Sequence, residues 1–177
     1  MDTKRFRATR RRGSLRNFQE ELSRRIAAAG TAVRKDLRLV VKSGTSGWLL
    51  RLPDAGELLP LPELTPVPLT RRWFSGVANV RGVLYAVVDL AAFLGEPQAA
   101  TQQSSRLMLV GQRYGTNAAL LVERVIGLGK LQDFTATERI RSVPWAGAEY
   151  LDAGGQRWCE LEVQALLQEP DFVQVGI

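Results

Sequence analysis

Few side chains in this sequence could support catalysis. The chain of 177 residues contains no histidine and one cysteine, Cys159, which excludes Ser-His-Asp relays, Cys-His pairs, imidazole metal sites and an intrachain disulfide. The carboxylates of Asp89, Glu123 and Glu160 have no spacing that predicts an acid/base pair. Cys159 stands beside Trp158 in an alternating strand and is interpreted as an ordinary buried side chain. We therefore expect no enzyme, no cofactor and no metal ion.

A glycine-rich run, Gly127-Leu128-Gly129-Lys130, resembles part of a phosphate-binding loop. Such a loop needs a glycine five residues before the Gly-Lys pair and a Ser or Thr directly after it. Arg124 and Leu131 occupy those two positions. We therefore expect no nucleotide site here.

The sequence contains better candidates for recognising another protein than for catalysis. In the segment WFSGVANVRGVLYAVVDLAAFLG, residues 73–95, Gly76 and Gly82 bracket a turn at which Asn79 and Arg81 face outward. Asparagine tolerates left-handed backbone and bonds its own main chain, and glycine permits a tight entry into the next strand. The planar guanidinium of an arginine held there can engage a carboxylate or backbone carbonyls.

Two valines flank that arginine. Val77 and Val80 supply apolar surface that a partner could bury beside Arg81. On the residues alone, the simpler interpretation is a turn with an exposed arginine, and the protein-binding interpretation stays open beside it.

Short apolar runs separated by turn residues must position this segment. They recur at intervals of about ten residues, which is typical of an all-β barrel or sandwich. Prolines 60, 62, 66 and 68 make their stretch an edge strand or a loop. The run 82–90 is almost continuously apolar and predicts a strand that is buried on both faces or closed into a barrel. The other expected elements are strands at 37–41, 48–52, 57–61, 106–110 and 117–125, a hairpin over 149–162, and a short helix over 163–167 ended by Pro170.

Basic residues are concentrated at the start of the chain. The first 38 residues hold 12 basic and 4 acidic residues, a net charge of +8, and the remainder holds 12 and 14, a net charge of −2. We interpret residues 1–35 as a basic arm followed by an amphipathic helix with apolar positions at 15, 18, 22, 26 and 29, and residues 36–177 as the folded domain. No run of residues is apolar enough for a signal peptide or a membrane span, so a cytoplasmic location is expected.

The segment from Gly76 to Gly95 resembles the signature of the CheW family of chemotaxis adaptors, G-V-x-N-V-R-G followed by V-D-L-x-x-F-L-G. The stretches 106–131 and 154–172 are similar to the second core segment and the closing hairpin of that family, so the resemblance covers about residues 46–172. The N-terminal extension, GVANVRG and the final P-x-F most resemble the adaptors of the pathway that controls type IV pili and twitching motility.

The resemblance implies a mainly β fold of two small, intertwined, five-stranded SH3-like barrels with a short C-terminal helix. It also implies a non-catalytic adaptor that joins the cytoplasmic tip of a methyl-accepting chemoreceptor to the regulatory domain of a CheA-type histidine kinase, with self-association in receptor arrays. Asn79, Arg81 and Gly82 match the turn near the receptor groove of the family, flanked by Val77 and Val80.

Two departures from the family pattern are visible. Ala86 stands where the family usually has a proline, and the stretch 56–68 is shorter than its counterpart. Glu63 is matched to a glutamate of the family across this deletion.

The rival interpretation is a small nucleic-acid-binding barrel with a basic arm. Small barrels bind oligonucleotides, and the arm has the required charge. The body has a net charge of −2 and lacks a basic strand with interleaved aromatic residues, which argues against nucleic acid as the partner.

Overall fold

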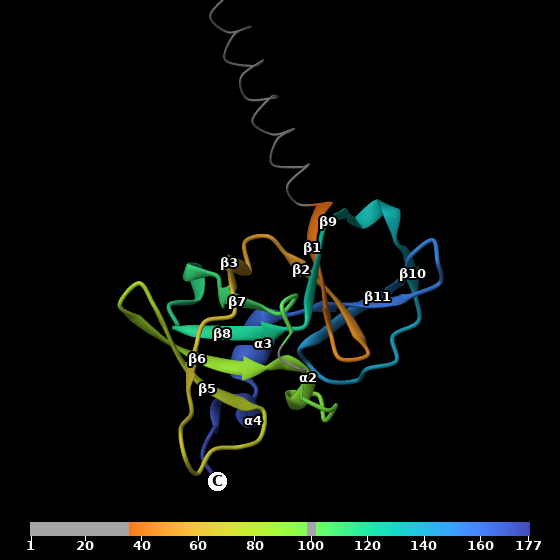
Figure 1. Cartoon of the computed structure of the whole chain (residues 1–177). Helices are drawn as coiled ribbons and strands as arrows, with labels where there is room; N and C mark the ends of the chain where they lie inside the picture. Colours follow the sequence, from red (N-terminus) through yellow and green to blue (C-terminus); the bar gives the residue numbers. More distant parts are fainter. Residues whose placement is uncertain (1–35, 99–101) are drawn as a thin grey trace, which may run out of the picture. The chain divides into compact units, whose positions relative to one another are not determined.

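The computed structural model describes residues 36–98 and 102–177. Twelve strands in this part of the chain form two six-stranded sheets (Figure 1). The first sheet has the order β10-β11-β12-β2-β1-β9, from β1 (Leu37–Ser43), β2 (Ser46–Arg51), β9 (Arg124–Lys130), β10 (Thr135–Thr137), β11 (Ala146–Leu151) and β12 (Arg157–Leu161). The second has the order β3-β7-β8-β6-β5-β4, from β3 (Ala55–Pro60), β4 (Leu64–Thr65), β5 (Phe74–Val80), β6 (Val83–Asp89), β7 (Arg106–Val110) and β8 (Ala118–Val122).

The helices are short. The α-helices are α2 (Leu90–Phe93), α3 (Val163–Gln168) and α4 (Pro170–Val173), and the 3₁₀ turns are η1 (Gln112–Tyr114) and η2 (Leu131–Asp133). None of the helices within the described ranges has the length and apolar character needed to cross a membrane. The expected helix over 15–29 and the basic arm lie outside the described residues.

The two sheets are intertwined along the chain. The second sheet is made entirely between β2 and β9, and the chain then returns to the first sheet, where β12 pairs in parallel with β2. The predicted mainly β architecture with two strand systems is confirmed. Each sheet has six strands and not five, since the two-residue β4 and the three-residue β10 each extend one edge.

Three apolar cores among the described residues explain the continuous apolar runs of the sequence. The largest core lies where the two sheets meet and includes Trp48 and Met108 from different sheets, with Leu166 and Phe172 from the C-terminal helices (blue in Figure 1). Each sheet also has a smaller core on its other face. A strand such as β7 therefore buries both its odd and its even side chains, which removes the alternation seen in half-exposed strands.

Three local expectations differ from the structure. Strand β6 is buried on both faces only from residue 87 onward, because its first half belongs to a projecting hairpin where Leu84 is exposed. The run 117–125 is two strands, since the chain leaves the second sheet at Val122 and enters the first at Arg124. Pro170 does not merely end a helix: α3 ends at Gln168, and Pro170 begins α4 at a position where its missing N–H costs nothing.

The proline-rich stretch lies at the sheet edges, as predicted. Pro60 ends β3, which is one edge of the second sheet, and β4, the other edge, begins four residues later. Proline lacks the N–H that a central strand needs, so edge placement costs no ladder hydrogen bond.

Candidate protein-binding groove

The predicted recognition turn is a two-residue loop at the tip of the β5–β6 hairpin. Val80 pairs with Val83 across the antiparallel ladder, which leaves Arg81 and Gly82 as the two loop residues. Their φ angles are 54° and 86°, the left-handed values that a type I′ hairpin turn requires at both central positions. The Oδ1 atom of Asn79 accepts a hydrogen bond of 2.9 Å from the Gly82 N–H and holds this turn closed.

Arg81 is an unusual residue for its position. Asparagine, aspartate or glycine normally fills the first loop position of a type I′ turn, because a left-handed φ strains other L-residues. The turn itself therefore gives no reason for an arginine. Strained backbone of this kind concentrates at functional sites, which makes the guanidinium the feature to explain.

The guanidinium of Arg81 forms a bidentate ion pair with Glu57 on β3. Its two terminal nitrogens donate hydrogen bonds of 2.8 and 2.6 Å to the two carboxylate oxygens. These hydrogen bonds raise the pKa of Arg81 above its ordinary value, and the negative charge of Glu57 raises it further by a smaller amount. The guanidinium therefore stays charged. The Arg81 side chain is still 73% exposed and that of Glu57 40% exposed, which leaves the pair accessible to a competing partner.

This ion pair bounds a groove of about 570 Å³. One wall is the hairpin, with Val80, Arg81 and Tyr85, and the opposite wall is β3, with Ala55 and Glu57; the end of β7 also lines it. Apolar walls with one charged rim are typical of a surface that binds another protein. We call this hollow the Arg81 groove.

The structure brings together only part of the predicted site. Val80 and Arg81 line the groove, and Gly82 and Asn79 shape its turn. Val77 is half-buried on β5 and does not line the groove. Glu63 is exposed directly before β4 and makes no ion pair among the described residues.

Glu57 is the residue of the Arg81 groove that the sequence analysis did not single out. It lies 24 positions before Arg81 and meets it only because β3 and the β5–β6 hairpin fold over the same hollow. No local spacing carries that information. A search for a carboxylate to match the outward arginine would have been the one available signal.

Of the residues weighed for catalysis, Asp89, Glu160 and Cys159 have structural roles. Asp89 caps α2, with its Oδ1 accepting a hydrogen bond of 3.1 Å from the Ala92 N–H, and Glu160 forms an ion pair of 2.8 Å with Arg38. Cys159 is fully buried, and this burial raises its thiol pKa to about 11, so the side chain is an inert packing group. The run 127–130 is part of β9 and forms no loop.

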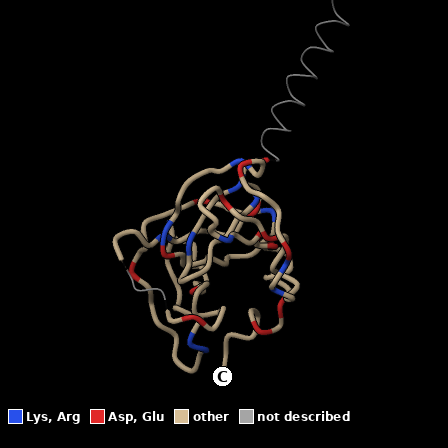
Figure 2. The backbone as a smooth tube through the Cα atoms, turned by 90° about the vertical axis from the view of Figure 1, so that its right-hand side faces the viewer, with Lys and Arg blue, Asp and Glu red and all other residues tan. Residues whose placement is uncertain are grey.

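Lysine and arginine are interspersed with aspartate and glutamate over the described part of the chain, as the blue and red segments of Figure 2 show. A nucleic-acid-binding domain typically clusters its basic residues on one face or along one element, whereas the two signs are mixed here along the sequence.

Comparison with known families identifies the domain. A family model described as the CheW-like domain matches residues 39–171. The chain belongs to the CheW-like family. Members of this family are non-catalytic adaptors and scaffolds of chemotaxis-type signalling, and the absence of a catalytic constellation predicted from the sequence agrees with that membership.

Individual relatives support the assignment. The chain is 26% identical over 165 residues to the protein PilI of Pseudomonas aeruginosa, which covers 89% of this chain and 92% of that protein. It is 32% identical over 71 residues to the chemotaxis protein CheW of Thermotoga maritima, 40% of this chain and 46% of that protein. The crystal structure of the scaffolding protein TtCheW from Thermoanaerobacter tengcongensis has the same fold, with a TM-score of 0.61 at 17% identity over 72% of this chain and 88% of that chain.

Proposed function

We propose that this CheW-like protein couples the cytoplasmic tip of a methyl-accepting chemoreceptor to the regulatory domain of a CheA-type histidine kinase. It would do so at receptor arrays in the cytoplasm, and the similarity to PilI supports a role in the pathway that controls type IV pili and twitching motility. The observation that carries the proposal is the accessible Arg81–Glu57 pair at the rim of the Arg81 groove.

The chemistry of the groove suits a helical receptor tip. A carboxylate or a free helix carbonyl of the partner would compete for the Arg81 guanidinium, which offers planar, bidentate hydrogen bonding. Val80 and Tyr85 would supply apolar contact beside the charge. Because Glu57 already holds the guanidinium in place, little side-chain entropy is lost when a partner binds.

The adaptor would act through stoichiometric binding. If receptor and kinase occupy different surfaces of one rigid domain, a change in receptor conformation can alter the relative stability of two kinase states. The size of this change equals the difference between the free energies with which the two kinase states bind. Rigidity follows from the shared core, which ties both sheets together.

A binding experiment tests the proposal. The full chain is purified from its native host as wild type and as Arg81→Asp, and co-purifying proteins are identified by mass spectrometry. Arg124→Asp is the matched control, because it changes the same charge at an exposed position on β9. We expect a chemoreceptor and a CheA-type kinase with wild type and with the control, and less of at least one with Arg81→Asp.

Two results would contradict it. Recovery of both partners in unchanged amounts with Arg81→Asp would remove the interface from the groove while keeping the adaptor role. Recovery of nucleic acid and neither protein would instead favour the basic N-terminal arm as the functional element.

A further inference from the structure

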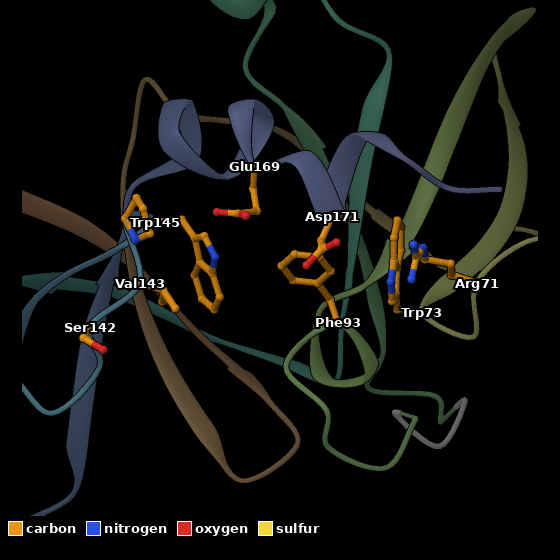
Figure 3. A pocket seen from close by; sticks show the side chains of 9 residues that line it. Arg71, Trp73, Phe93, Ser142, Val143, Trp145, Glu169 and Asp171 are labelled. Carbon is orange, nitrogen blue, oxygen red and sulfur yellow. The ribbon is translucent and has the colours of Figure 1, made fainter. Parts of the chain in front are cut away.

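A second hollow, which shares no lining residue with the Arg81 groove, lies against the core where the sheets meet. Its volume is about 370 Å³. Aromatic side chains from three parts of the chain form its walls (Figure 3): Trp73 directly before β5, Phe93 at the end of α2 and Trp145 directly before β11. We call it the aromatic pocket.

The walls of the aromatic pocket are fixed by ring contacts. Trp73 stacks on the buried Phe172, with centroids 6.1 Å apart and an interplanar angle of 6°, and meets Phe93 edge-on at 5.4 Å. Phe93 in turn contacts Trp145 at 5.8 Å, and Trp145 contacts the fully buried Trp48 at the same distance. The pocket is therefore largely preformed, and occupying it costs little reorganisation.

Two carboxylates stand at the pocket without partners. Glu169 and Asp171 flank Pro170 at the junction of α3 and α4, and both line the hollow. Figure 3 shows their carboxylate groups on the pocket side of the two helices, beside the aromatic rings. Among the residues that the structure describes, neither side chain forms an ion pair or a hydrogen bond.

The basic residue that lines the pocket, Arg71, is already engaged. Its Nε donates a hydrogen bond of 3.0 Å to the Gln174 carbonyl, and its backbone N–H donates one of 2.8 Å to the Val175 carbonyl. In Figure 3 the guanidinium lies on the other side of Trp73 from Phe93. Arg71 is the one basic side chain among the described residues that line the pocket, so the side facing Glu169 combines negative charge with aromatic surface.

We propose that the aromatic pocket is a docking site for an arginine side chain presented by an extended segment of a partner protein. A guanidinium packs favourably against aromatic rings and binds carboxylates bidentately, so the half-buried rings of Trp73 and Phe93, together with Glu169 and Asp171, offer both halves of its chemistry. A volume of about 370 Å³ accommodates one such side chain with part of its neighbour. The lysine ammonium is more strongly hydrated and cannot stack, which makes arginine the better occupant.

This inference does not depend on receptor or kinase coupling through the Arg81 groove. It adds a second contact surface whose charge has the opposite sign. The Arg81 groove presents a cation to its partner, and the aromatic pocket presents carboxylates. Failure of one proposal leaves the other standing.

The test is a titration followed through the tryptophan indole N–H signals of the ¹⁵N-labelled full chain. The probe is the blocked peptide acetyl-Ala-Phe-Arg-Ala-amide, compared with peptides that carry lysine or the neutral isostere citrulline in place of arginine. We expect saturable shifts of Trp73 and Trp145, and no shift of Trp158, whose indole N–H donates to Asp152 in a separate core. The citrulline peptide should bind at least about tenfold more weakly.

Variants assign the site. Glu169→Gln combined with Asp171→Asn should weaken the arginine peptide by about tenfold. Asp133→Asn combined with Glu138→Gln removes the same charge from exposed positions elsewhere and should leave binding unchanged. Absence of saturable shifts, equal binding of the arginine peptide and either analogue, or an equal loss in the control variant would overturn the proposal.

Discussion

Two arginine–carboxylate clusters lie within a few residues of each other along the chain, one buried and one exposed. Asp54, directly before β3, has a fully buried side chain that accepts hydrogen bonds from Arg51 at 3.0 Å, from the Tyr114 hydroxyl at 2.8 Å and from Arg113. Three residues later Glu57 pairs with Arg81 in contact with solvent. The chemical groups are the same, and their surroundings differ.

The difference separates stability from recognition. A buried carboxylate is costly unless every oxygen is satisfied, so Asp54 is surrounded by donors and joins β2, β3 and η1. An exposed ion pair adds little to the free energy of folding, because water solvates its charges nearly as well. The Arg81–Glu57 pair is thus free to exchange its partner, whereas the Asp54 cluster is not.

Removal of the buried carboxylate should have the largest effect on stability. Asp54→Ala leaves Arg51, Arg113 and Tyr114 without their acceptor, and we expect a loss of about 2–3 kcal/mol in the free energy of unfolding. The loss stays below that of a fully buried pair, because both guanidinium groups are about half exposed and regain water.

Urea denaturation measures this loss, and Glu57→Ala is the matched variant. We expect the midpoint of Glu57→Ala to stay close to that of wild type. Equal midpoints for both variants would remove the distinction between the two clusters.

A second buried carboxylate, Glu149, makes the free energy of unfolding depend on pH. Burial of Glu149 raises its pKa, but hydrogen bonds from the Arg141 and Ile140 N–H groups and from Arg157 outweigh burial and lower it below the ordinary value of 4.5. Its folded-state pKa is lower than its unfolded-state pKa, so its stabilisation is complete above about pH 5 and is lost as the pH falls through the folded-state pKa.

Unfolding free energies between pH 3 and pH 7 test this assignment. Glu149→Gln should be less stable than wild type at pH 7. The difference should shrink as the pH falls below 4.5 and disappear below the lowered folded-state pKa, where folded wild type also loses the charge. A difference that is independent of pH would show that the carboxylate charge contributes nothing.

The exposed cluster can be tested without loss of stability. Arg81→Asn removes the ion pair and places at the first loop position the residue that a type I′ turn prefers. We therefore expect a midpoint of thermal unfolding equal to or above that of wild type. We also expect weaker binding of a purified cytoplasmic fragment of the chemoreceptor. A lowered midpoint would mean that Arg81 holds the hairpin in place and that its main role is structural.

The sequence predicts the strands of this fold better than it predicts where the chain passes from one sheet to the other. Continuous apolar runs such as 106–110 correctly indicate strands buried on two faces, and the prolines correctly mark the edges. The switch of sheets at Glu123 carries no turn residue and could not be seen.

The same limit applies to the candidate site. Arg81, Asn79 and Gly82 form a local turn, so their spacing is informative. Glu57 joins them through long-range strand pairing, which leaves no periodic signal. The aromatic pocket collects residues from positions 71 to 171, and its walls are invisible in any one segment.

A charge exchange across the groove tests most directly whether the partner binds the Arg81 guanidinium itself. Affinities of a purified receptor cytoplasmic fragment are measured for wild type, Arg81→Glu, Glu57→Arg and the double variant, which restores an ion pair with reversed direction. We predict at least about tenfold weaker binding for Arg81→Glu and no recovery in the double variant. Wild-type affinity in Arg81→Glu, or full recovery in the double variant, would contradict the assignment of this groove as the recognition site.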